Sequence, residues 1–341
     1  MNAILQSFAL HPSDFAIERI GTGHIHQTFK LTGEKSYVLQ RINHDVFKEP
    51  GMIASNLRLA SDYLAKNFPH YTFLRCVPAI NKTDMVYDEE GFPWRLFHYL
   101  ENTITIDKVE TADEAFSAAS EFAKLTRYLD KINVTDFKET IPYFHDLNLR
   151  YQQFETALAK ATSERIENAN PWIDAGKRFY PLVENYRSLT TSGSLRLRIT
   201  HNDTKINNIL FDAVSRKAVS VIDLDTLMPG YYIYDLGDMV RTFVSPVSEE
   251  EKDYSKIIFR REIYNALLEG FMSQMENVMT TKEKTAIPFS GKMMAYIMAL
   301  RFLTDYLNGD MYYHTDYPGQ NLVRAGNQFS FLSILEDSLQ G

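Results

Sequence analysis

Two short segments near the middle of the chain constrain its fold more than any other part of the sequence. The first, residues 201–208, reads HNDTKINN and is rich in side chains that carry charge or bind cations. Asp203 offers a carboxylate that could orient and deprotonate a hydroxyl group. Asn208, five residues later, offers a neutral amide oxygen that suits a hard cation. Lys205 stands between them, where it could reach a phosphate group.

The second segment, residues 219–225, reads VSVIDLD. Its β-branched run predicts a buried strand that delivers the carboxylate of Asp223 to a cleft. Asp225, two residues on, falls on the same face of an extended chain. Asn208 and Asp223 could then hold one metal ion from two separate segments, with Asp225 in support.

These parts match the needs of phosphoryl transfer from ATP to a hydroxyl group. That reaction requires a proton acceptor, oxygen ligands for Mg²⁺ and a cation on the developing charge. Asp203, the pair Asn208 and Asp223, and Lys205 would fill the three roles. The alternative is that the same residues only cap a turn and end a strand. It requires the order and spacing of both segments to be accidental, so we predict a phosphotransferase that uses ATP and Mg²⁺.

Composition excludes several other classes of protein. With 341 residues, 45% of them hydrophobic, the chain can bury one large core or two ordinary ones. The single cysteine, Cys76, excludes an internal disulfide, and the N-terminus lacks the basic start and apolar run of a secretion signal. No segment approaches the ~20 uninterrupted apolar residues of a membrane helix, so we expect a cytoplasmic protein. The net charge of −8, without a basic block, indicates neither a nucleic-acid nor a membrane surface, and no obligate protein partner is evident.

The first hundred residues predict a small antiparallel sheet crossed by one helix. Short β-type runs are separated by turns that contain glycine, and a stretch with helical spacing of apolar residues follows. A Glu-Glu-Gly turn between two further runs predicts a closing hairpin. The expected strands are 15–20, 28–32, 37–42, 85–87 and 94–100, and the expected helix is 50–67.

The remainder of the chain reads mainly as helices, with the catalytic segment among them as an irregular loop and a metal-binding hairpin. The expected fold class is therefore α+β, in two lobes. Residues 1–103 should form an N-lobe that binds the nucleotide, and residues 104–341 a C-lobe that carries the catalytic and acceptor-binding groups. The expected helices of this second part are 112–129, 147–161, 170–189, 250–279 and 288–307.

A turn that contains glycine precedes the second expected strand. Gly21 and Gly23 are small enough to let backbone amides approach phosphates closely. The third glycine of a G-x-G-x-x-G loop is absent, since His26 stands there, so a plain hairpin turn is the alternative. Its place ahead of a complete catalytic loop favours nucleotide binding. Tyr99 and Glu101, where the lobes join, complete the expected nucleotide contacts.

The third expected strand lacks the lysine with which kinases hold the α- and β-phosphates. Alternation from Val38, our candidate for the residue that faces adenine, puts Gln40 at the lysine position. Either Gln40 makes a neutral contact, or a bulge turns Arg41 inward. The helix 50–67 offers Asn56 near the position where the glutamate partner of that lysine is expected.

The chain as a whole resembles the aminoglycoside phosphotransferase and choline kinase superfamily, and within it looks most like the N-acetylhexosamine 1-kinases. The catalytic loop of kinases is written H-R-D-x-K-x-x-N and is followed by a metal-binding aspartate. The closer resemblance rests on GTGHIHQTF, YVLQRIN, HNDTKINNILFD, VIDLDTLMPG, YDLGDMVR and RFLTDYLNGD, which span nearly the full length. It implies a protein-kinase-like bilobal fold and ATP-dependent phosphorylation of the anomeric (C1) hydroxyl of GlcNAc or GalNAc.

The resemblance also implies roles for individual residues. Asp203 would be the base that hydrogen-bonds the sugar O1, and Asn208 and Asp223 would bind Mg²⁺, supported by Asp225. Asp235, in YDLGDMVR, would hold the catalytic loop by its backbone amides. An anomeric hydroxyl is more acidic than an ordinary alcohol, so a carboxylate of modest pKa can serve as its base.

The expected acceptor site lies near the end of the chain. In the resembled family an arginine that matches Arg301 contacts the sugar, whereas the alternative is an ordinary ion pair with Asp305 one helical turn away. His24, in the glycine turn, and its neighbour His26 could close the sugar pocket or face solvent. Aromatic residues that follow Arg301 could present their rings to a sugar: they are Tyr312, Tyr313, His314 and Tyr317, with Tyr312 and Tyr317 as the candidates for substrate binding.

Three classes of function remain open. The first is the sugar 1-kinase, and the second is a kinase for another small alcohol, of the choline or ethanolamine, homoserine or aminoglycoside type. The third is a kinase-like protein that binds a nucleotide or a partner without catalysis, which the missing lysine keeps open. A quaternary amine would call for an aromatic and acidic cage, and an aminoglycoside for a strongly acidic groove. Arg301 among tyrosines suits a neutral sugar better.

Overall fold

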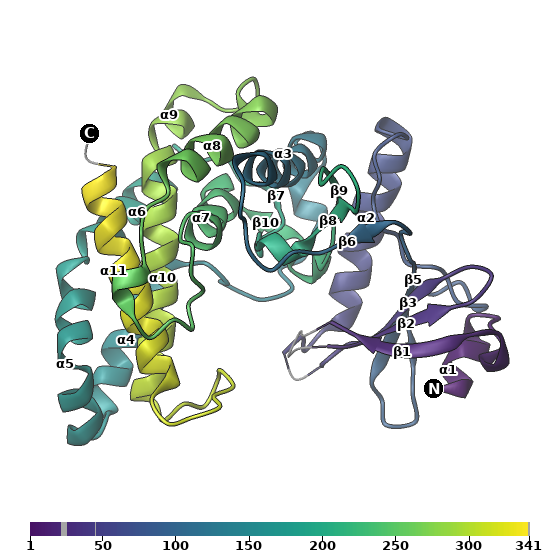
Figure 1. Ribbon diagram of the computed structural model, residues 1–341, viewed down its shortest axis with the longest axis horizontal. Helices are drawn as coiled ribbons and strands as arrows, with labels where there is room; N and C mark the ends of the chain where they lie inside the picture. The colour runs from purple at the N-terminus through teal and green to yellow at the C-terminus, as the bar shows by residue number, and fades with distance from the viewer. Residues whose placement is uncertain (22–25, 45, 340–341) are drawn as a thin grey trace.

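The computed structural model of the protein describes residues 1–21, 26–44 and 46–339. Figure 1 shows two lobes side by side, a small one built on a twisted antiparallel sheet and a larger one made mainly of helices. This arrangement confirms the predicted α+β fold in two lobes. Gly23 and His24, two of the predicted site residues, lie outside the described residues.

The sheet of the N-lobe is antiparallel, with strand order β1-β2-β3-β5-β4. Alternation along the strands puts large apolar side chains such as Leu39 on one face, where they form a small core with α1 (Asn2–Ser7). The other face turns toward the C-lobe, because Arg95 on it contacts Asp225. The strands are β1 (Ala16–Ile20), β2 (Gln27–Thr32), β3 (Tyr37–Arg41), β4 (Val86–Tyr87) and β5 (Pro93–His98).

Helix α2 (Pro50–Asn67) connects the two lobes. Proline at its first position costs no intrahelical hydrogen bond, and its apolar stripe joins the main core of the protein. Asn56 is buried, donates to the backbone oxygens of Lys138 and Leu227, and accepts the N–H of Lys138. The residue near the expected glutamate position therefore ties α2 to the C-lobe backbone.

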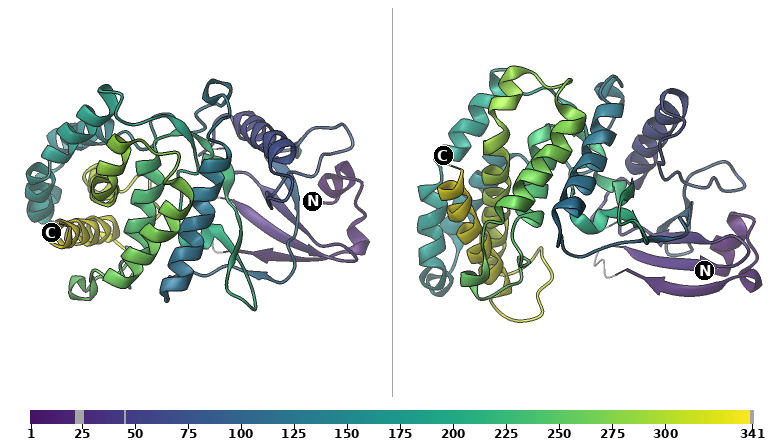
Figure 2. Two further views of the ribbon diagram at one scale, coloured as in Figure 1. Left: turned by 90° about the horizontal axis from the view of Figure 1, so that it is seen from above. Right: turned by 45° about the horizontal axis from the view of Figure 1, so that its top comes forward.

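The C-lobe is organised around α10 (Ile287–Leu307), which is buried along most of its length. Glycines allow its neighbours to approach closely: a Cβ added at Gly237 would lie 2.4 Å from the backbone oxygen of Ser290. The two views of Figure 2 show α10 and α11 side by side, on the part of the C-lobe away from the sheet. The other helices are α3 (Ala112–Tyr128), α4 (Leu147–Lys160), α5 (Ser163–Arg178), α6 (Pro181–Thr191), α7 (Tyr232–Phe243), α8 (Arg261–Met275), α9 (Thr281–Thr285) and α11 (Gln320–Ser338).

Short strands position the two segments that carry the predicted chemistry. Residues 201–208 connect β7 to β8, and residues 222–227 connect β9 to β10. The N–H of Ile222 donates to the backbone oxygen of Asn208, which brings the two connections together. The strands involved are β6 (Thr103–Ile104), β7 (Arg198–Thr200), β8 (Ile209–Asp212), β9 (Ala218–Val221) and β10 (Met228–Gly230), in the pairs β6-β8, β8-β9 and β7-β10.

Several predicted helices differ from the structure. The helix predicted over 170–189 is wrong, because Pro181 starts a new helix and divides the region into α5 and α6. The helix predicted over 250–279 is confined to α8. Helices α1, α7, α9 and α11 are absent from the prediction; α11 buries polar side chains such as Asn321 and Asn327, which hide its helical pattern. No helix in the described ranges is long and apolar enough to cross a membrane.

Candidate active site

Asp235, in helix α7, binds backbone groups of the loop that contains Asp203. Asp235 Oδ2 accepts the N–H of His201 at 3.0 Å, and its Oδ1 accepts the N–H of Asn202 at 2.7 Å. The backbone oxygen of Asp235 accepts the hydroxyl of Thr204 at 2.7 Å. These contacts confirm the predicted structural position of Asp235 and fix the backbone on both sides of Asp203.

Asp203, Lys205 and Asn208 face one another across the loop. Lys205 Nζ lies 3.4 Å from Asp203 Oδ1, and Asn208 Nδ2 donates to Asp203 Oδ2 at 3.1 Å. Burial opposes ionisation of Asp203, but Lys205 and His201 hold its pKa below the usual value, and Asp203 raises the pKa of Lys205. The loop thus presents an ionised carboxylate beside a charged lysine. Because the amide nitrogen of Asn208 is turned to Asp203, its amide oxygen is left as a ligand atom.

Asp223 lies two residues after β9 and has a left-handed backbone conformation, with φ 57° and ψ 58°. It forms no hydrogen bond or ion pair with any residue that the structure describes. Its pKa is raised to about 6, because the surrounding protein reduces its hydration and the carboxylates of Asp225 and Asp203 lie near it. A cation at this point would relieve that repulsion.

Asp225 is 1% exposed and contacts two side chains of the N-lobe, Arg95 and His26. Arg95 Nη1 lies 2.5 Å from its Oδ1, and His26 Nε2 lies 2.7 Å from its Oδ2. The N–H of Asn43 donates to His26 Nδ1, so Nε2 carries the proton that is given to Asp225. Burial opposes ionisation of Asp225, but Arg95 and His26 hold its pKa well below the usual range. Each carboxylate oxygen of Asp225 thus already faces one nitrogen of the N-lobe, which suits a supporting position beside the metal.

The residues fit a divalent cation at this corner of the cleft. Asn208 and Asp223 supply an amide and a carboxylate oxygen, the hard ligands that Mg²⁺ prefers, and a site of one or two carboxylates leaves room for phosphates. Ligand atoms of His26, Asp223 and Asp225 all lie within 4.8 Å of one another. Asp223, without a partner and with a raised pKa, is the ligand that a cation would satisfy most directly.

The strand that lacks lysine is regular, so the bulge considered for Arg41 is wrong. The register of β3 with β2 and with β5 is continuous through Gln40 and Arg41. Arg41 points to the opposite face of the sheet, where it pairs with Asp88 and Glu90 and stacks on the ring of Phe92. Gln40 lies on the face toward the C-lobe, where its Oε1 accepts from the guanidinium of Arg95. The neutral contact of Gln40 with the phosphates stays a prediction.

The other residues predicted to contact the nucleotide lie along the same face of the sheet and at its end. Val38 pairs with Lys30 and is two residues from Gln40, on the face toward the C-lobe. Lys30 Nζ lies 3.8 Å from the ring centre of Tyr99. Gly21 adopts φ +79°, a conformation open to glycine, and Glu101 is exposed in the turn before β6.

Arg301 lies in α10 beside three aromatic rings. Its Cζ is 5.2 Å from the ring centre of Phe144, 5.4 Å from that of Tyr313 and 5.9 Å from that of Tyr312. The alternative of an ion pair with Asp305 is wrong. Asp305 instead accepts the backbone N–H groups of residues 311–313 and so fixes the loop that carries both tyrosines.

His145 and Arg150 extend this region to the catalytic loop, and the sequence analysis missed both. His145 Nε2 donates to the backbone oxygen of Asn202 at 2.8 Å, and its buried Nδ1 has no hydrogen-bond partner among the described residues. Burial, together with the charges of Arg301 and Arg150, lowers its pKa to about 3, so the ring is neutral. Burial and the charge of Arg301 lower the pKa of Arg150 to about 10. Neither arginine has an ion pair within the described ranges.

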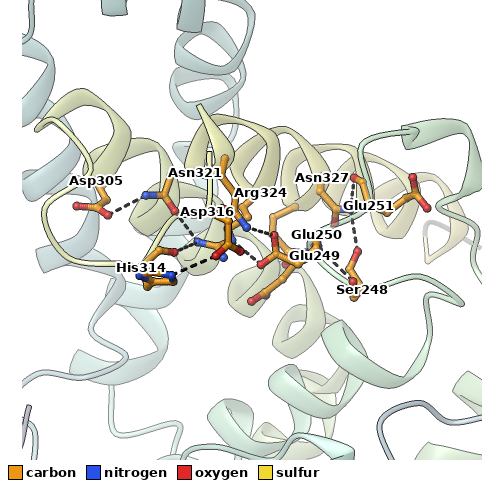
Figure 3. Close-up of polar contacts among 12 residues, drawn as sticks. Ser248, Glu249, Glu250, Glu251, Asp305, His314, Asp316, Asn321, Arg324 and Asn327 are labelled. Atoms are coloured by element: carbon orange, nitrogen blue, oxygen red, sulfur yellow. Dashed lines mark hydrogen bonds and ion pairs between the residues drawn. The ribbon is translucent and has the colours of Figure 1, made fainter. Parts of the chain in front are cut away.

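Helix α11 anchors the two loops that border this region (Figure 3). Asn321 Nδ2 donates to Asp305 and to Asp310, at 3.0 and 2.9 Å. Arg324 donates to Glu250 Oε1 at 2.6 Å and to the backbone oxygen of His314 at 3.0 Å, so it joins the loop after α7 to the loop before α11.

Tyr312 and Tyr317, the predicted substrate contacts of the second loop, are placed apart. Tyr312 lies near Arg301 and is 65% exposed. Tyr317 lies under Lys252, whose Nζ is 3.9 Å from its ring centre, and is not among the described rings around Arg301. The structure therefore brings Arg301 together with Tyr312 and Tyr313, and turns Tyr317 to the neighbouring loop.

The most informative residue that the sequence analysis missed is Arg95. Its signal was present, since alternation along the expected strand 94–100 puts Arg95, Phe97 and Tyr99 on one face. Only the pairing of β5 with β3 shows that this face includes Gln40.

Two lobes, with a candidate base and candidate oxygen ligands between them, are typical of kinase-like phosphotransferases. The chain belongs to the phosphotransferase enzyme family, whose model matches residues 16–258. That match includes the sheet, the catalytic loop and both predicted metal ligands. It ends before α10 and α11, so Arg301 and the tyrosines near it lie beyond the matched residues.

Solved structures of other kinases share the fold. The microcompartment-associated aminopropanol kinase has a TM-score of 0.64 and 15% identity, over 99% of this chain and 96% of its own. An aminoglycoside phosphotransferase from Alicyclobacillus acidocaldarius has a TM-score of 0.64 and 13% identity, over 100% and 96%. A choline/ethanolamine kinase family protein from Mesorhizobium loti has a TM-score of 0.58 and 14% identity, over 94% and 88%. At these identities the likeness shows the fold.

Proposed function

We propose that the protein is an ATP-dependent kinase that phosphorylates the anomeric hydroxyl of an N-acetylhexosamine, GlcNAc or GalNAc, to give the sugar 1-phosphate. The observation that carries the proposal is the pair Arg301 and Arg150, without acidic partners, beside aromatic rings and His145. Guanidinium donors and aromatic faces suit a neutral sugar, and the same charges repel a cationic acceptor such as choline or an aminoglycoside. The choice of N-acetylhexosamines among neutral sugars rests on the motif resemblance, above all RFLTDYLNGD.

In this proposal Asp203 accepts the proton of the sugar hydroxyl. Asp235 and Asn208 hold it in place, and Lys205 keeps it ionised at neutral pH. General base catalysis contributes about 10²–10⁴-fold, and alignment of the two substrates contributes much of the rest. Lys205 also faces the expected position of the transferred phosphoryl group, where it stabilises the developing charge. Mg²⁺, held by Asn208 and Asp223 with support from Asp225, supplies further neutralisation of the phosphates.

The runner-up acceptor is an amine-bearing alcohol. Solved structures with the same fold include an aminopropanol kinase and a choline/ethanolamine kinase family protein. Such a substrate requires acidic groups around its ammonium. Glu249, which interacts with Lys205 and Tyr313, is one candidate, but it is already paired with Arg241 at 2.6 Å.

The test is ³¹P NMR of the purified protein with Mg-ATP and one acceptor at a time: GlcNAc, GalNAc, galactose, choline, ethanolamine, homoserine or kanamycin. We expect an anomeric phosphate signal with an N-acetylhexosamine. The signal should be absent with Asp203→Asn and present with Asp174→Asn, a matched change on the exposed face of α5. Normal turnover by Asp203→Asn would contradict the assignment of the base.

The remaining outcomes separate the alternatives. Turnover only with choline, ethanolamine, homoserine or kanamycin would keep the phosphotransferase and discard the sugar. Binding of ATP without turnover of any acceptor would favour the non-catalytic alternative.

A further inference from the structure

The N-lobe contains a row of polar side chains that crosses three strands. Thr28, Gln40 and Arg95 are paired in register on β2, β3 and β5, so they lie on one face of the sheet. Arg95 donates from Nε and Nη2 to Gln40 Oε1, at 2.9 and 2.5 Å. Gln40 Nε2 donates to Thr28 Oγ1 at 3.2 Å. Both ends of the Gln40 amide are therefore used, and Gln40 orients the guanidinium of Arg95.

The guanidinium of Arg95 lies at the edge of the candidate metal site. Its Nη1 is 2.5 Å from Asp225 Oδ1, and a carboxylate oxygen of Asp225 is within 4.8 Å of one of Asp223. Arg95 is 2% exposed, and Asp225 supplies the negative charge that such a buried cation requires. A guanidinium has five N–H groups. Gln40 accepts from Nε and from one N–H of Nη2. Nη1 lies beside Asp225 but, like the second N–H of Nη2, has no hydrogen-bond acceptor among the described residues.

We propose that Arg95 is the N-lobe cation that holds the phosphates of the nucleotide, in place of the lysine that β3 lacks. The charge has moved one strand across the sheet, and Gln40 at the original position serves to aim it. The inference rests on the proposed ATP-dependent function but not on the identity of the acceptor. A planar guanidinium can also pair with two phosphate oxygens at once, which a lysine cannot.

The other cations of this sheet fit the role less well. Arg41 is on the opposite face and is already paired with Asp88 and Glu90. Lys30 shares the face of Arg95, but it lies over the ring of Tyr99, at the end of the sheet where the lobes join.

The test compares phosphate-dependent with phosphate-independent binding. Isothermal titration calorimetry with Mg²⁺ and without acceptor measures the dissociation constants of ATP and of adenosine. We expect Arg95→Gln to weaken ATP about 10- to 100-fold, the loss typical of a charge-assisted contact, and adenosine less than about twofold. Arg41→Gln tests the other arginine, and Arg58→Gln, an exposed N-lobe arginine paired with Asp84, is the matched control; both should bind ATP as the unaltered protein does.

A double variant returns the cation to β3. Gln40→Lys with Arg95→Gln keeps one positive charge in the row and should recover most of the ATP affinity. If Arg95→Gln alone does not fold, the double variant still tests the proposal, because the lysine introduced at position 40 would keep a positive charge near the buried Asp225. Thermal melting without ligand reports the folding of each variant.

Two results would overturn the proposal. One is unchanged ATP affinity in folded Arg95→Gln; the other is an equal loss for ATP and adenosine, which would indicate a structural role only. A folded double variant that still binds ATP about 10- to 100-fold more weakly than the unaltered protein would also count against it. Failure of the unaltered protein to bind ATP contradicts the proposed function itself, and so is distinguishable from a failure of the Arg95 assignment.

Discussion

Asp235 Oδ1 accepts the backbone N–H of Asn202 at 2.7 Å, and so connects the first turn of α7 to the residue that precedes the candidate base. Asn202 has φ +65°, a conformation that a residue other than glycine adopts only when its surroundings hold it. The helix and the neighbouring backbone therefore determine where the carboxylate of Asp203 lies.

Replacing the Asp235 carboxylate should disturb the position of the catalytic loop more than it weakens substrate binding. In Asp235→Asn an amide nitrogen would face one of two backbone N–H groups, which leaves that group unsatisfied and costs about 1–3 kcal/mol of folding free energy. We expect kcat to fall at least tenfold with a smaller change in KM. Urea denaturation and steady-state kinetics check both effects. Asp212→Asn, which also removes a carboxylate bonded to backbone N–H groups but in an exposed turn, should leave kcat unchanged.

Arg301 should affect the acceptor and not the nucleotide. Arg301→Gln removes a charge that has no partner among the described residues, so the fold should tolerate it. We expect kcat/KM for the sugar to fall about 10- to 100-fold, or about 1.4–2.8 kcal/mol, with the dissociation constant of ATP unchanged. Arg178→Gln, an exposed arginine that also stacks on an aromatic ring, is the control. An equal loss of ATP affinity would contradict the assignment of Arg301 to the acceptor site.

Side chains of α11 hold the loops beside the candidate acceptor site. We expect the loss of a buried contact to cost more stability than the loss of an exposed one. Asn321 is 0% exposed and holds both Asp305 and Asp310, so Asn321→Ala should cost about 1–3 kcal/mol and raise the KM for the acceptor. The ion pair of Arg324 with Glu250 is partly exposed, so Arg324→Ala should cost about 0–1 kcal/mol from that pair. Thermal denaturation and acceptor kinetics compare the two variants. A larger effect of Arg324→Ala than of Asn321→Ala would contradict this prediction.

Arg198 and Glu283 form a buried pair outside the site, with both side chains 0% exposed. Burial opposes ionisation of Glu283, but Arg198 holds its pKa below the usual value. A depressed carboxyl pKa contributes stability that is present above the unfolded pKa of about 4.3 and is lost as pH falls through the folded pKa. Glu283→Gln should therefore be destabilised by about 3–5 kcal/mol at pH 7, and by progressively less below pH 4.

A double-mutant cycle tests this pair. Arg198→Met with Glu283→Leu removes both charges and should be more stable than Glu283→Gln alone, in which the buried Arg198 keeps only its ion pair with Asp130 among the described residues. Additive losses in urea denaturation would show that the two side chains do not interact.

Asp203, Lys205 and Asn208 lie within six residues, so a short loop held by backbone contacts brings them together, and their chemistry is visible in the spacing alone. Asp223 and Asp225 follow a strand whose β-branched run is equally visible. The short-range patterns of strands and helices likewise predicted the two lobes and most of their elements. Each of these depends on interactions between residues close in the chain, where side-chain type and spacing carry the physical information.

The tertiary structure alone decided which distant side chains meet. Arg95 reaches Gln40 through the register of β5 on β3, and reaches Asp225 through the packing of the two lobes. Asp305 fixes a backbone loop instead of pairing with Arg301, four residues away on the same helix. The sequence by itself determined the class of fold and the spacing of the candidate catalytic and metal-binding residues, because local patterns specify them. The position of the N-lobe cation and the walls of the acceptor site depend on cross-strand register and helix packing, which no local pattern specifies.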